Sequence, residues 1–321
     1  MLKSKYIFFT IFVFFIMVSC VIKANTANDL RRAEKLLITQ NYNKSFNLYQ
    51  RIATEDKEPI AQFSLALFYD YGWGRVKDIK KACHWYKKAS QHDIPAAANA
   101  YADCLVKGSL GSINYTEAAV WYKKAAELGL HFSYCHLGDL YINGQGVEKN
   151  IKKGLALCES AADKGSIPAM LHLGEYYLAP KTEPSNQAAF HWFSSAASYR
   201  SSEAEYNLGL MARDGLANSK DHYTALHWFE RAASKGYKPA YLATATHYYH
   251  TPKDSETGFL SATNLAKAYL WLSASKKVLL TENQKALVQD MLKEILTVMP
   301  QSWVADLDKK VKAHLDQFPP Q

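Results

Sequence analysis

The most constraining feature of this sequence is a motif that returns about every 36 residues. Successive copies are 36, 36, 35 and 36 residues apart, and they centre on Trp85, Trp121, Leu157, Trp192 and Trp228. Tyr49 lies 36 residues before the first of these, and Trp271 lies 43 residues after the last. Self-similarity at such a period is typical of repeat proteins, in which each unit buries its apolar face only by stacking on its neighbours.

Each repeat has the pattern of two helices. Apolar and small residues recur at spacings of three and four, which is the helical period. The first helix of a repeat (helix A) is predicted over segments such as 61–69 and 204–212, and the second (helix B) over segments such as 79–90 and 223–234. Alanine and glycine at paired positions allow close helix contact, and we expect the repeated tryptophan to fill the gap beside them. The sequence therefore predicts an all-α fold of stacked antiparallel helix pairs.

The expected helix ends repeat at the same period. Short polar residues, which favour the N-cap of a helix at about 1 kcal/mol each, stand seven residues before the aromatic positions: Asp78, Asn114, Asn150, Ser185, Asp221 and Asn264. Gly129, Gly165 and Gly236 stand where a left-handed C-terminal cap is expected. Further glycines are expected to adopt positive φ in the connections between helices A and B: Gly72, Gly74, Gly108, Gly111, Gly144 and Gly146.

These patterns divide the chain into four segments. We expect a signal peptide over 1–24, a capping helix pair over 25–58, six repeats over 59–275, and C-terminal capping helices over 276–321. Thr281 and Gln284 have the spacing of a capping box at the start of one terminal helix. End elements with a polar outer face keep such a stack soluble.

The first segment has the layout of an export signal. Lys3 and Lys5 precede an apolar run over 7–18, which is short for a membrane span of about 20 residues. A permanent anchor helix is the alternative. Cleavage before Cys20 would give a lipoprotein tethered by its acyl chains, whereas cleavage after Ala24 would give a soluble periplasmic or secreted protein.

Composition and motifs give little sign of catalysis or cofactor binding. The formal charge is +8, but the basic residues are spread along the chain, which argues against a nucleic-acid surface. We find no glycine-rich phosphate loop, no HExxH or CxxC motif, and we assign no catalytic, cofactor or metal residues. His247 and His250 lack further ligands nearby. Three histidines each precede a repeat tryptophan and are interpreted as one repeated surface position: His84, His191 and His227.

The motifs resemble those of the sel-1-like repeat, a subfamily of the tetratricopeptide repeats. Residues 133–154 nearly spell out the pattern AxxxLGxxYxxGxGVxK(N/D)xxK(A/G), and residues 118–129 and 225–236 match AxxW(Y/F)xxAAxxG. The resemblance covers residues 59–275. It implies a right-handed superhelix that acts as an adaptor in assembling complexes, and it implies that helix A lines the concave side. Many exported bacterial members are linked to envelope functions or contact with host cells.

Four cysteines follow the signal segment, and two interpretations remain open for them. Cys135 and Cys158 fall in the two helices of one repeat, and Cys83 and Cys104 fall in adjacent helices of neighbouring repeats. Either pair can form a disulfide if its Cα atoms lie within about 7 Å. Each cysteine also replaces an apolar residue of other copies, which favours four small core residues. Some secreted members carry a regular pair in every repeat and are associated with β-lactam binding, but this chain lacks that pair.

The predicted concave face carries a row of acidic residues. Asp103, Asp139 and Glu175 recur every 36 residues, two positions after the leucine of the LG motif or its equivalent. Phe63, Asn99 and Tyr206 stand two positions before that residue in their repeats, among apolar and aromatic equivalents. These six residues form the predicted partner-binding face, suited to a segment with basic residues. A solvated charged stripe without a partner is the alternative.

We expect a monomeric, non-enzymatic adaptor or scaffold for proteins, located in the bacterial envelope or secreted. The membrane is expected to bind it only through the signal or a lipid anchor. A cell-wall or β-lactam hydrolase is one alternative, and it would need a compact polar pocket with perturbed pKa values. A peptidoglycan- or glycan-binding module is the other.

Overall fold

The structure, a computed structural model, describes residues 25–179 and 183–319. Those residues contain helices, turns and loops and no strand, so the predicted all-α class is confirmed for them. The chain forms two compact units, 1–166 and 167–321. The proposed signal segment and Cys20 lie outside the described residues. None of the described helices is both long and apolar enough to cross a membrane.

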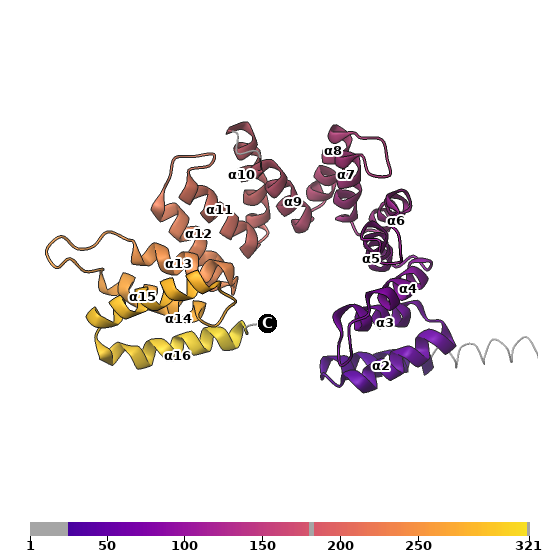
Figure 1. Ribbon diagram of the computed structural model, residues 1–321, viewed down its shortest axis with the longest axis horizontal. Helices are drawn as coiled ribbons and strands as arrows, with labels where there is room; N and C mark the ends of the chain where they lie inside the picture. The colour runs from indigo at the N-terminus through magenta and orange to yellow at the C-terminus, as the bar shows by residue number, and fades with distance from the viewer. Residues whose placement is uncertain (1–24, 180–182, 320–321) are drawn as a thin grey trace, which may run out of the picture. The chain divides into compact units, whose positions relative to one another are not determined.

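The first unit contains three complete helix pairs behind an N-terminal element. Residues 25–38 are helical and are followed by α2 (Tyr42–Arg51) and a π-helical turn, η1 (Ile52–Asp56). The pairs are α3 (Pro59–Tyr71) with α4 (Ile79–Ser90), α5 (Pro95–Val106) with α6 (Tyr115–Glu127), and α7 (Ser133–Asn143) with α8 (Ile151–Asp163). Within a pair the helices pack together, and α4 and α6 also pack on the first helix of the next pair (Figure 1).

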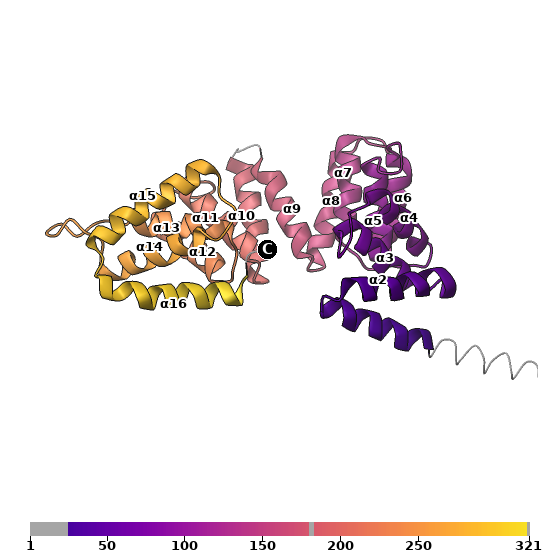
Figure 2. The ribbon, with the colours of Figure 1, turned by 60° about the horizontal axis from the view of Figure 1, so that its bottom comes forward.

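The second unit continues the pattern and ends in two longer helices. Its pairs are α9 (Ile167–Leu178) with α10 (Glu183–Ser198), α11 (Ser202–Asp214) with α12 (His222–Ser234), and α13 (Pro239–Tyr249) with α14 (Ala262–Ser275). Helices α15 (Glu282–Val298) and α16 (Gln301–Gln317) both pack on α14 (Figure 2). Their apolar side chains, including Ile295 and Leu307, close the end of the core.

Most of the predicted helix caps are confirmed. Asp78, Asn114, Asn150 and Asp221 each accept a hydrogen bond from a backbone N–H of the first turn of α4, α6, α8 and α12. Thr281 and Gln284 form the expected capping box of α15. The nine glycines predicted at helix ends and connections all have positive φ.

Two predicted caps are wrong because the helices begin earlier than the repeat spacing indicates. Ser185 lies inside α10. Asn264 lies inside α14, where Ser261 is the N-cap and accepts a hydrogen bond from the Asn264 backbone N–H. The Asn264 side chain instead donates to the Thr251 hydroxyl, 2.9 Å away, and so fastens the expanded loop before α14.

The close helix contacts rest on the small residues, but the tryptophan is not the residue that fills the gap. A Cβ at Gly138 of α7 would lie 2.4 Å from the backbone oxygen of Gly154 on α8. In other repeats the residue after the tryptophan is buried, as at Phe193 and Phe229, whose rings lie against the Cα of Gly174 and Gly209. The tryptophans before them are only half-buried. In these repeats the ring that enters the helix interface therefore stands one position later than predicted, whereas Trp271 in the last repeat is itself buried.

Candidate functional site

The six predicted face residues all lie on first helices of pairs and all reach solvent. In the first unit, Phe63 is on α3, Asn99 and Asp103 are on α5, and Asp139 is on α7. In the second unit, Glu175 is on α9 and Tyr206 is on α11. Glu175 is exposed and the other five are partly buried, whereas positions beside them, such as Gln62, Ala98, Ala102, Leu140, Gly174 and Glu205, are buried. Of the three predicted acidic residues, Asp103 and Asp139 lie in the first unit and Glu175 lies in the second.

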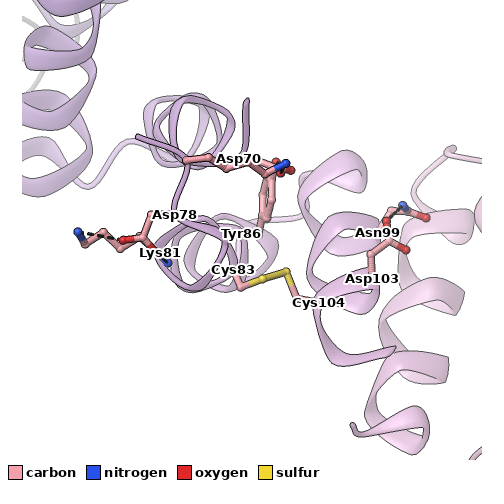
Figure 3. Close-up of a disulfide and its surroundings, with 9 residues drawn as sticks. Asp70, Asp78, Lys81, Cys83, Tyr86, Asn99, Asp103 and Cys104 are labelled. Carbon is pink, nitrogen blue, oxygen red and sulfur yellow. Dashed lines mark hydrogen bonds and ion pairs between the residues drawn. A yellow bond between two sulfur atoms is a disulfide. The ribbon is translucent and has the colours of Figure 1, made fainter. Parts of the chain in front are cut away.

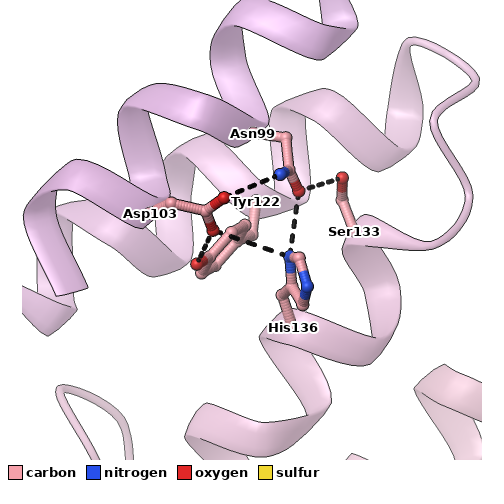
Figure 4. Close-up of polar contacts among 5 residues, drawn as sticks. All are labelled: Asn99, Asp103, Tyr122, Ser133 and His136. Atoms are coloured by element: carbon pink, nitrogen blue, oxygen red, sulfur yellow. Dashed lines mark hydrogen bonds and ion pairs between the residues drawn. The ribbon is translucent and has the colours of Figure 1, made fainter. Parts of the chain in front are cut away.

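Asp103 lies at the centre of a polar network that joins three helices (Figure 4). The Tyr122 hydroxyl on α6 donates a hydrogen bond to Asp103 Oδ1 over 2.5 Å, and Asn99 Nδ2 on α5 donates to Oδ2 over 3.3 Å. His136 Nδ1 on α7 lies 3.8 Å from Oδ1 and 3.0 Å from Asn99 Oδ1. Ser133, also on α7, donates to the same Asn99 oxygen over 2.8 Å. Asp103 and Asn99 therefore hold α5, α6 and α7 together as well as facing solvent.

The tyrosine in this network stays protonated at any physiological pH. Burial is the first cause that raises the pKa of the Tyr122 hydroxyl, followed by its hydrogen bond to Asp103 and by the charges of Asp103 and Asp139. A neutral hydroxyl that donates to an ionised carboxylate makes a charge-assisted hydrogen bond, which is stronger than one between neutral groups. The contact therefore stabilises the fold without removing the negative charge from the face.

The preceding pair carries a related contact. The Tyr86 hydroxyl on α4 donates to Asp70 on α3 over 3.0 Å, and Lys77 lies 3.6 Å from the same carboxylate. Burial and Asp70 raise the pKa of Tyr86. Phe63 packs against the Tyr86 ring at a centroid distance of 5.8 Å, so this predicted face residue partly belongs to the core. The sequence analysis missed Asp70, although an acidic residue 16 positions before the buried tyrosine was the available signal.

In the second unit, Glu175 belongs to a cluster of carboxylates and tyrosines. Burial raises the pKa of Glu203 on α11, and the charge of Glu175 raises it further. Burial, Glu203, Tyr206 and Glu175, in that order, raise the pKa of Tyr237 to about 12. The rings of Tyr206 and Tyr237 have centroids 5.4 Å apart. This part of the face therefore combines negative charge with two adjacent aromatic rings.

Tyr206 also lines a cavity of about 650 Å³ within the second unit. Leu242 on α13 occupies the register position that corresponds to Tyr206, and it lines the same cavity. The remaining wall comes from the start of α13 and from the connection between α14 and α15, and it includes Lys238, Lys276 and Lys277. The sequence analysis did not single out these lysines. The run of two lysines followed by Val-Leu-Leu after the last repeat was the signal for Lys276 and Lys277, whereas no local pattern pointed to Lys238.

The cysteines form two disulfides and are also buried. Cys83 on α4 is joined to Cys104 on α5, with Cα atoms 5.9 Å apart (Figure 3). Cys135 on α7 is joined to Cys158 on α8, with Cα atoms 4.2 Å apart. The interpretation of four unpaired core thiols therefore does not hold in this structure. The core positions are shared with other repeats, but here they also bring the sulfur atoms together.

The histidines occupy simple structural or surface positions. His84, His191 and His227 are exposed, as their place before the tryptophans predicted. His247 Nδ1 lies 2.9 Å from the Ala243 carbonyl oxygen, and the His247 ring stacks on His222 at 5.0 Å. Burial lowers the pKa of His247. Within residues 25–179 and 183–319, no group of three or more histidine, cysteine or acidic side chains has an arrangement that could hold a metal ion.

Stacked helix pairs with half-exposed side chains along their first helices define a helical-repeat protein of the tetratricopeptide type. The chain belongs to the Sel1 repeat family, whose sequence model matches more than half of it, at residues 35–56, 59–93, 95–130, 131–166, 167–198 and 202–237. This result confirms the resemblance stated from the motifs. Repeats of this family generally serve as scaffolds that bind other proteins.

Solved structures show the same fold. A protective antigen of uropathogenic Escherichia coli with the Sel1-like fold has a TM-score of 0.57 and 22% identity, and the match covers 87% of this chain and 57% of that protein. A Sel1 repeat protein from Oxalobacter formigenes has a TM-score of 0.57 and 23% identity, and the match covers 77% of this chain and 99% of that protein. No curated protein matches the sequence significantly. At these identities the likeness concerns the fold alone.

Proposed function

We propose that this protein is a non-enzymatic scaffold that binds partner proteins along the first helices of its repeats. The observation that supports this proposal is the alternation on those helices. Face residues such as Asn99, Asp139 and Tyr206 reach solvent, while their helical neighbours are buried between the pairs. The packed helix pairs within each unit hold the exposed side chains in place, and tyrosine is among the residues enriched at protein interfaces. We also propose that the protein acts as a monomer and does not bind nucleic acid.

Site-specific crosslinking tests the proposed binding face. A photo-reactive phenylalanine analogue is placed at Phe63 or Tyr206, both half-buried aromatic positions on first helices. The matched control position is Tyr223, a 64% exposed aromatic residue on the second helix α12. Irradiation of intact cells should join the same proteins to the two face positions and not to the control. Equal capture at all three positions, or none at the face, would contradict the proposal.

Charge reversal tests the acidic part of this face. We propose that the carboxylates bind basic residues of the partner, so Asp139→Lys combined with Glu175→Lys should reduce crosslinked partner at least tenfold. Asp103 is left unchanged because its loss would disrupt the contacts among α5, α6 and α7. The control is Glu127→Lys combined with Glu256→Lys, two exposed acidic residues in the same two units. Partner recovery that is equal in both variants would remove the acidic row from the binding face.

We further propose that the protein is exported to the bacterial envelope or beyond it, where it contributes to contacts with host cells. The signal-like segment over 1–24 and two disulfides in one unit support this location, because disulfides persist in oxidising compartments. Fractionation of cells and lipid labelling of the wild-type chain and of Cys20→Ala would separate a lipoprotein from a soluble exported protein. Intact cells are lysed and the protein is unfolded in the presence of an alkylating reagent, which reacts only with free thiols. Reaction of all four core cysteines would contradict the oxidising location.

A further inference from the structure

The cavity beside Tyr206 has an apolar wall and a basic edge. Tyr206 on α11 and Leu242 on α13 present partly buried side chains to it. Leu279, in the connection between α14 and α15, also lines the cavity, and its side chain is fully exposed. A fully exposed leucine at the mouth of an apolar cavity gives a guest more apolar surface to bury. The cavity volume of about 650 Å³ lies within the usual range for binding sites.

The three lysines around the cavity have no partner charge. Lys238, Lys276 and Lys277 make no ion pair within the described part of the chain, and no described carboxylate lines the cavity. Lysines at the end of α14 are favourable near its C-terminal carbonyl groups, which accounts in part for Lys276 and Lys277. Lys238 belongs to a different element, before α13, so the helix end does not explain why all three surround one cavity. The cavity lining therefore carries positive charge and no negative charge, and a guest with carboxylates could supply the missing negative charge.

We propose that this cavity binds an acidic segment of a partner protein that carries apolar side chains. The apolar side chains would pack on Tyr206 and Leu242, and the carboxylates would pair with Lys238 and with Lys276 or Lys277. The proposal rests on the protein-binding function proposed above and gives the partner its chemistry at this site. Charge complementarity of this kind fixes the register of a guest and speeds its association.

The surroundings also restrict where the guest can carry its charge. The charges of Glu203 and Glu175 act on Tyr237, whose ring centroid lies 5.4 Å from that of Tyr206. An acidic guest would be repelled there. The carboxylates of the guest would therefore pair with the lysines, and any part of the guest near Glu175 and Glu203 would be neutral or basic.

Peptide binding to the full-length protein tests the proposal. The probe is a fluorescein-labelled octapeptide of alternating leucine and aspartate, and its matched control has lysine in place of aspartate. We expect saturable binding of the acidic peptide, at least tenfold tighter than the basic one and weakened by added salt, since exposed charges are screened. Absence of saturable binding of the acidic peptide, or equal binding of both peptides, would overturn the proposal.

Variants place the peptide in the cavity. The pocket variant is Lys238→Glu, Lys276→Glu and Lys277→Glu, and the control variant is Lys293→Glu, Lys309→Glu and Lys312→Glu. The control lysines are exposed on α15 and α16, do not line this cavity, and change the net charge equally. Only the pocket variant should lose binding, by tenfold or more, with an unchanged thermal melt. Equal loss in both variants would show a nonspecific charge effect and would reject the site.

Two further arms separate the other outcomes. Binding of the wild type to phosphatidylglycerol vesicles, lost in the pocket variant, without binding of the acidic peptide would assign the cavity to a lipid surface and reject the peptide. Crosslinking from Tyr206 in cells is then compared between the wild type and the pocket variant. If both capture the same partner, the scaffold function holds and this cavity assignment fails. If neither Phe63 nor Tyr206 captures a protein in the wild type, the proposed scaffold function itself fails.

Discussion

At the scale of single residues, one hydroxyl distinguishes repeats that are otherwise alike. The buried residue after the tryptophan is tyrosine at Tyr86 and Tyr122 and phenylalanine at Phe193 and Phe229. Both tyrosines donate a hydrogen bond to an aspartate on a first helix. The hydroxyl therefore adds a hydrogen bond between the two helices to a ring that already fills their interface. A phenylalanine ring is accommodated at this position elsewhere in the same chain.

The substitution Tyr122→Phe should therefore remove the hydrogen bond to Asp103 and leave the packing of the ring intact. We expect the free energy of unfolding to fall by about 1–2 kcal/mol, as for a hydrogen bond to a charged group at a partly exposed site. Urea unfolding measures the change, and a double-mutant cycle with Asp103→Ala isolates the pairwise contribution. Tyr223→Phe, at an exposed tyrosine, should stay within about 0.5 kcal/mol of the wild type. A cycle with no coupling between Tyr122 and Asp103 would contradict the assigned contact.

Gly138 shows the opposite case, in which any side chain is harmful. Glycine inside a helix normally costs about 0.5–1 kcal/mol relative to alanine, so Gly138→Ala would be expected to stabilise an isolated helix. In this structure the new Cβ would lie 2.4 Å from the Gly154 oxygen, so α7 and α8 would have to separate. We predict destabilisation by about 3 kcal/mol, the upper part of the range for overpacking. Thermal melting measures this change. A Tm higher than that of the wild type would contradict the prediction.

At the scale of helices and their connections, the sequence predicted where helices begin and end better than it predicted which side chains contact one another. N-caps and positive-φ glycines depend on a few neighbouring residues, and four caps stand where Asp78, Asn114, Asn150 and Asp221 indicated. The early starts of α10 and α14 could not be found by this route, because loop changes shift the start without shifting the aromatic residue. The network around Asp103 was also out of reach, since it joins residues from three helices that no local pattern relates.

The two disulfides connect helices in different ways. Cys83–Cys104 joins the second helix of one pair to the first helix of the next, with a sequence separation of 21. Cys135–Cys158 joins the two helices of one pair, with a separation of 23. Spacing alone permitted both pairings but could not distinguish them from four apolar core residues, because each cysteine is also buried.

Replacing Cys83 and Cys104 together with serine should destabilise the first unit by about 3 kcal/mol, the contribution expected for a loop of this length. Hydrogen exchange measured at increasing denaturant concentration shows in which unit the stability is lost. Protection should fall over α4 and α5 and remain unchanged over α11–α14, whose helices contain no cysteine. Replacing both residues with alanine controls for the polarity of serine. Uniform loss of protection across both units would contradict a local role.

At the scale of the whole molecule, each unit has its own core and its own chemical sensitivity. The first unit holds both disulfides and clusters around residues such as Phe68 and Tyr101. The second holds a cluster that includes Tyr241, Trp271 and the terminal helices, and it contains the partly buried histidines His247 and His314. Reducing agents are therefore expected to act on the first unit, whereas protonation of these two histidines is expected to act on the second.

Acid should destabilise the second unit. Burial lowers the pKa of His314, whose ring packs on Tyr241 and Trp271, and burial is also the first cause that lowers the pKa of His247. The unfolded chain binds protons near pH 6.5, where the folded unit resists them, so the free energy of unfolding falls as pH drops below about 6.5. Urea unfolding at pH 7.5 and 5.5 measures this loss.

The variant His314→Gln should make unfolding less sensitive to pH, since it removes one of the two groups but keeps a hydrogen-bonding side chain near the Tyr241 hydroxyl. His227→Gln, at an exposed histidine of α12, should leave the pH dependence unchanged. If the two variants respond to acid alike, His314 does not contribute to the acid sensitivity.

The contact between Gly138 and Gly154 has a consequence for the history of the chain. Repeats multiply by duplication, and a fresh copy starts with its parent's residues at every position. Here two backbones touch because neither residue has a side chain, so alanine or a larger residue at one site alone opens the helix pair. A single substitution at either position is therefore expected to be disfavoured, whereas exposed residues of the same two helices can change without opening the pair.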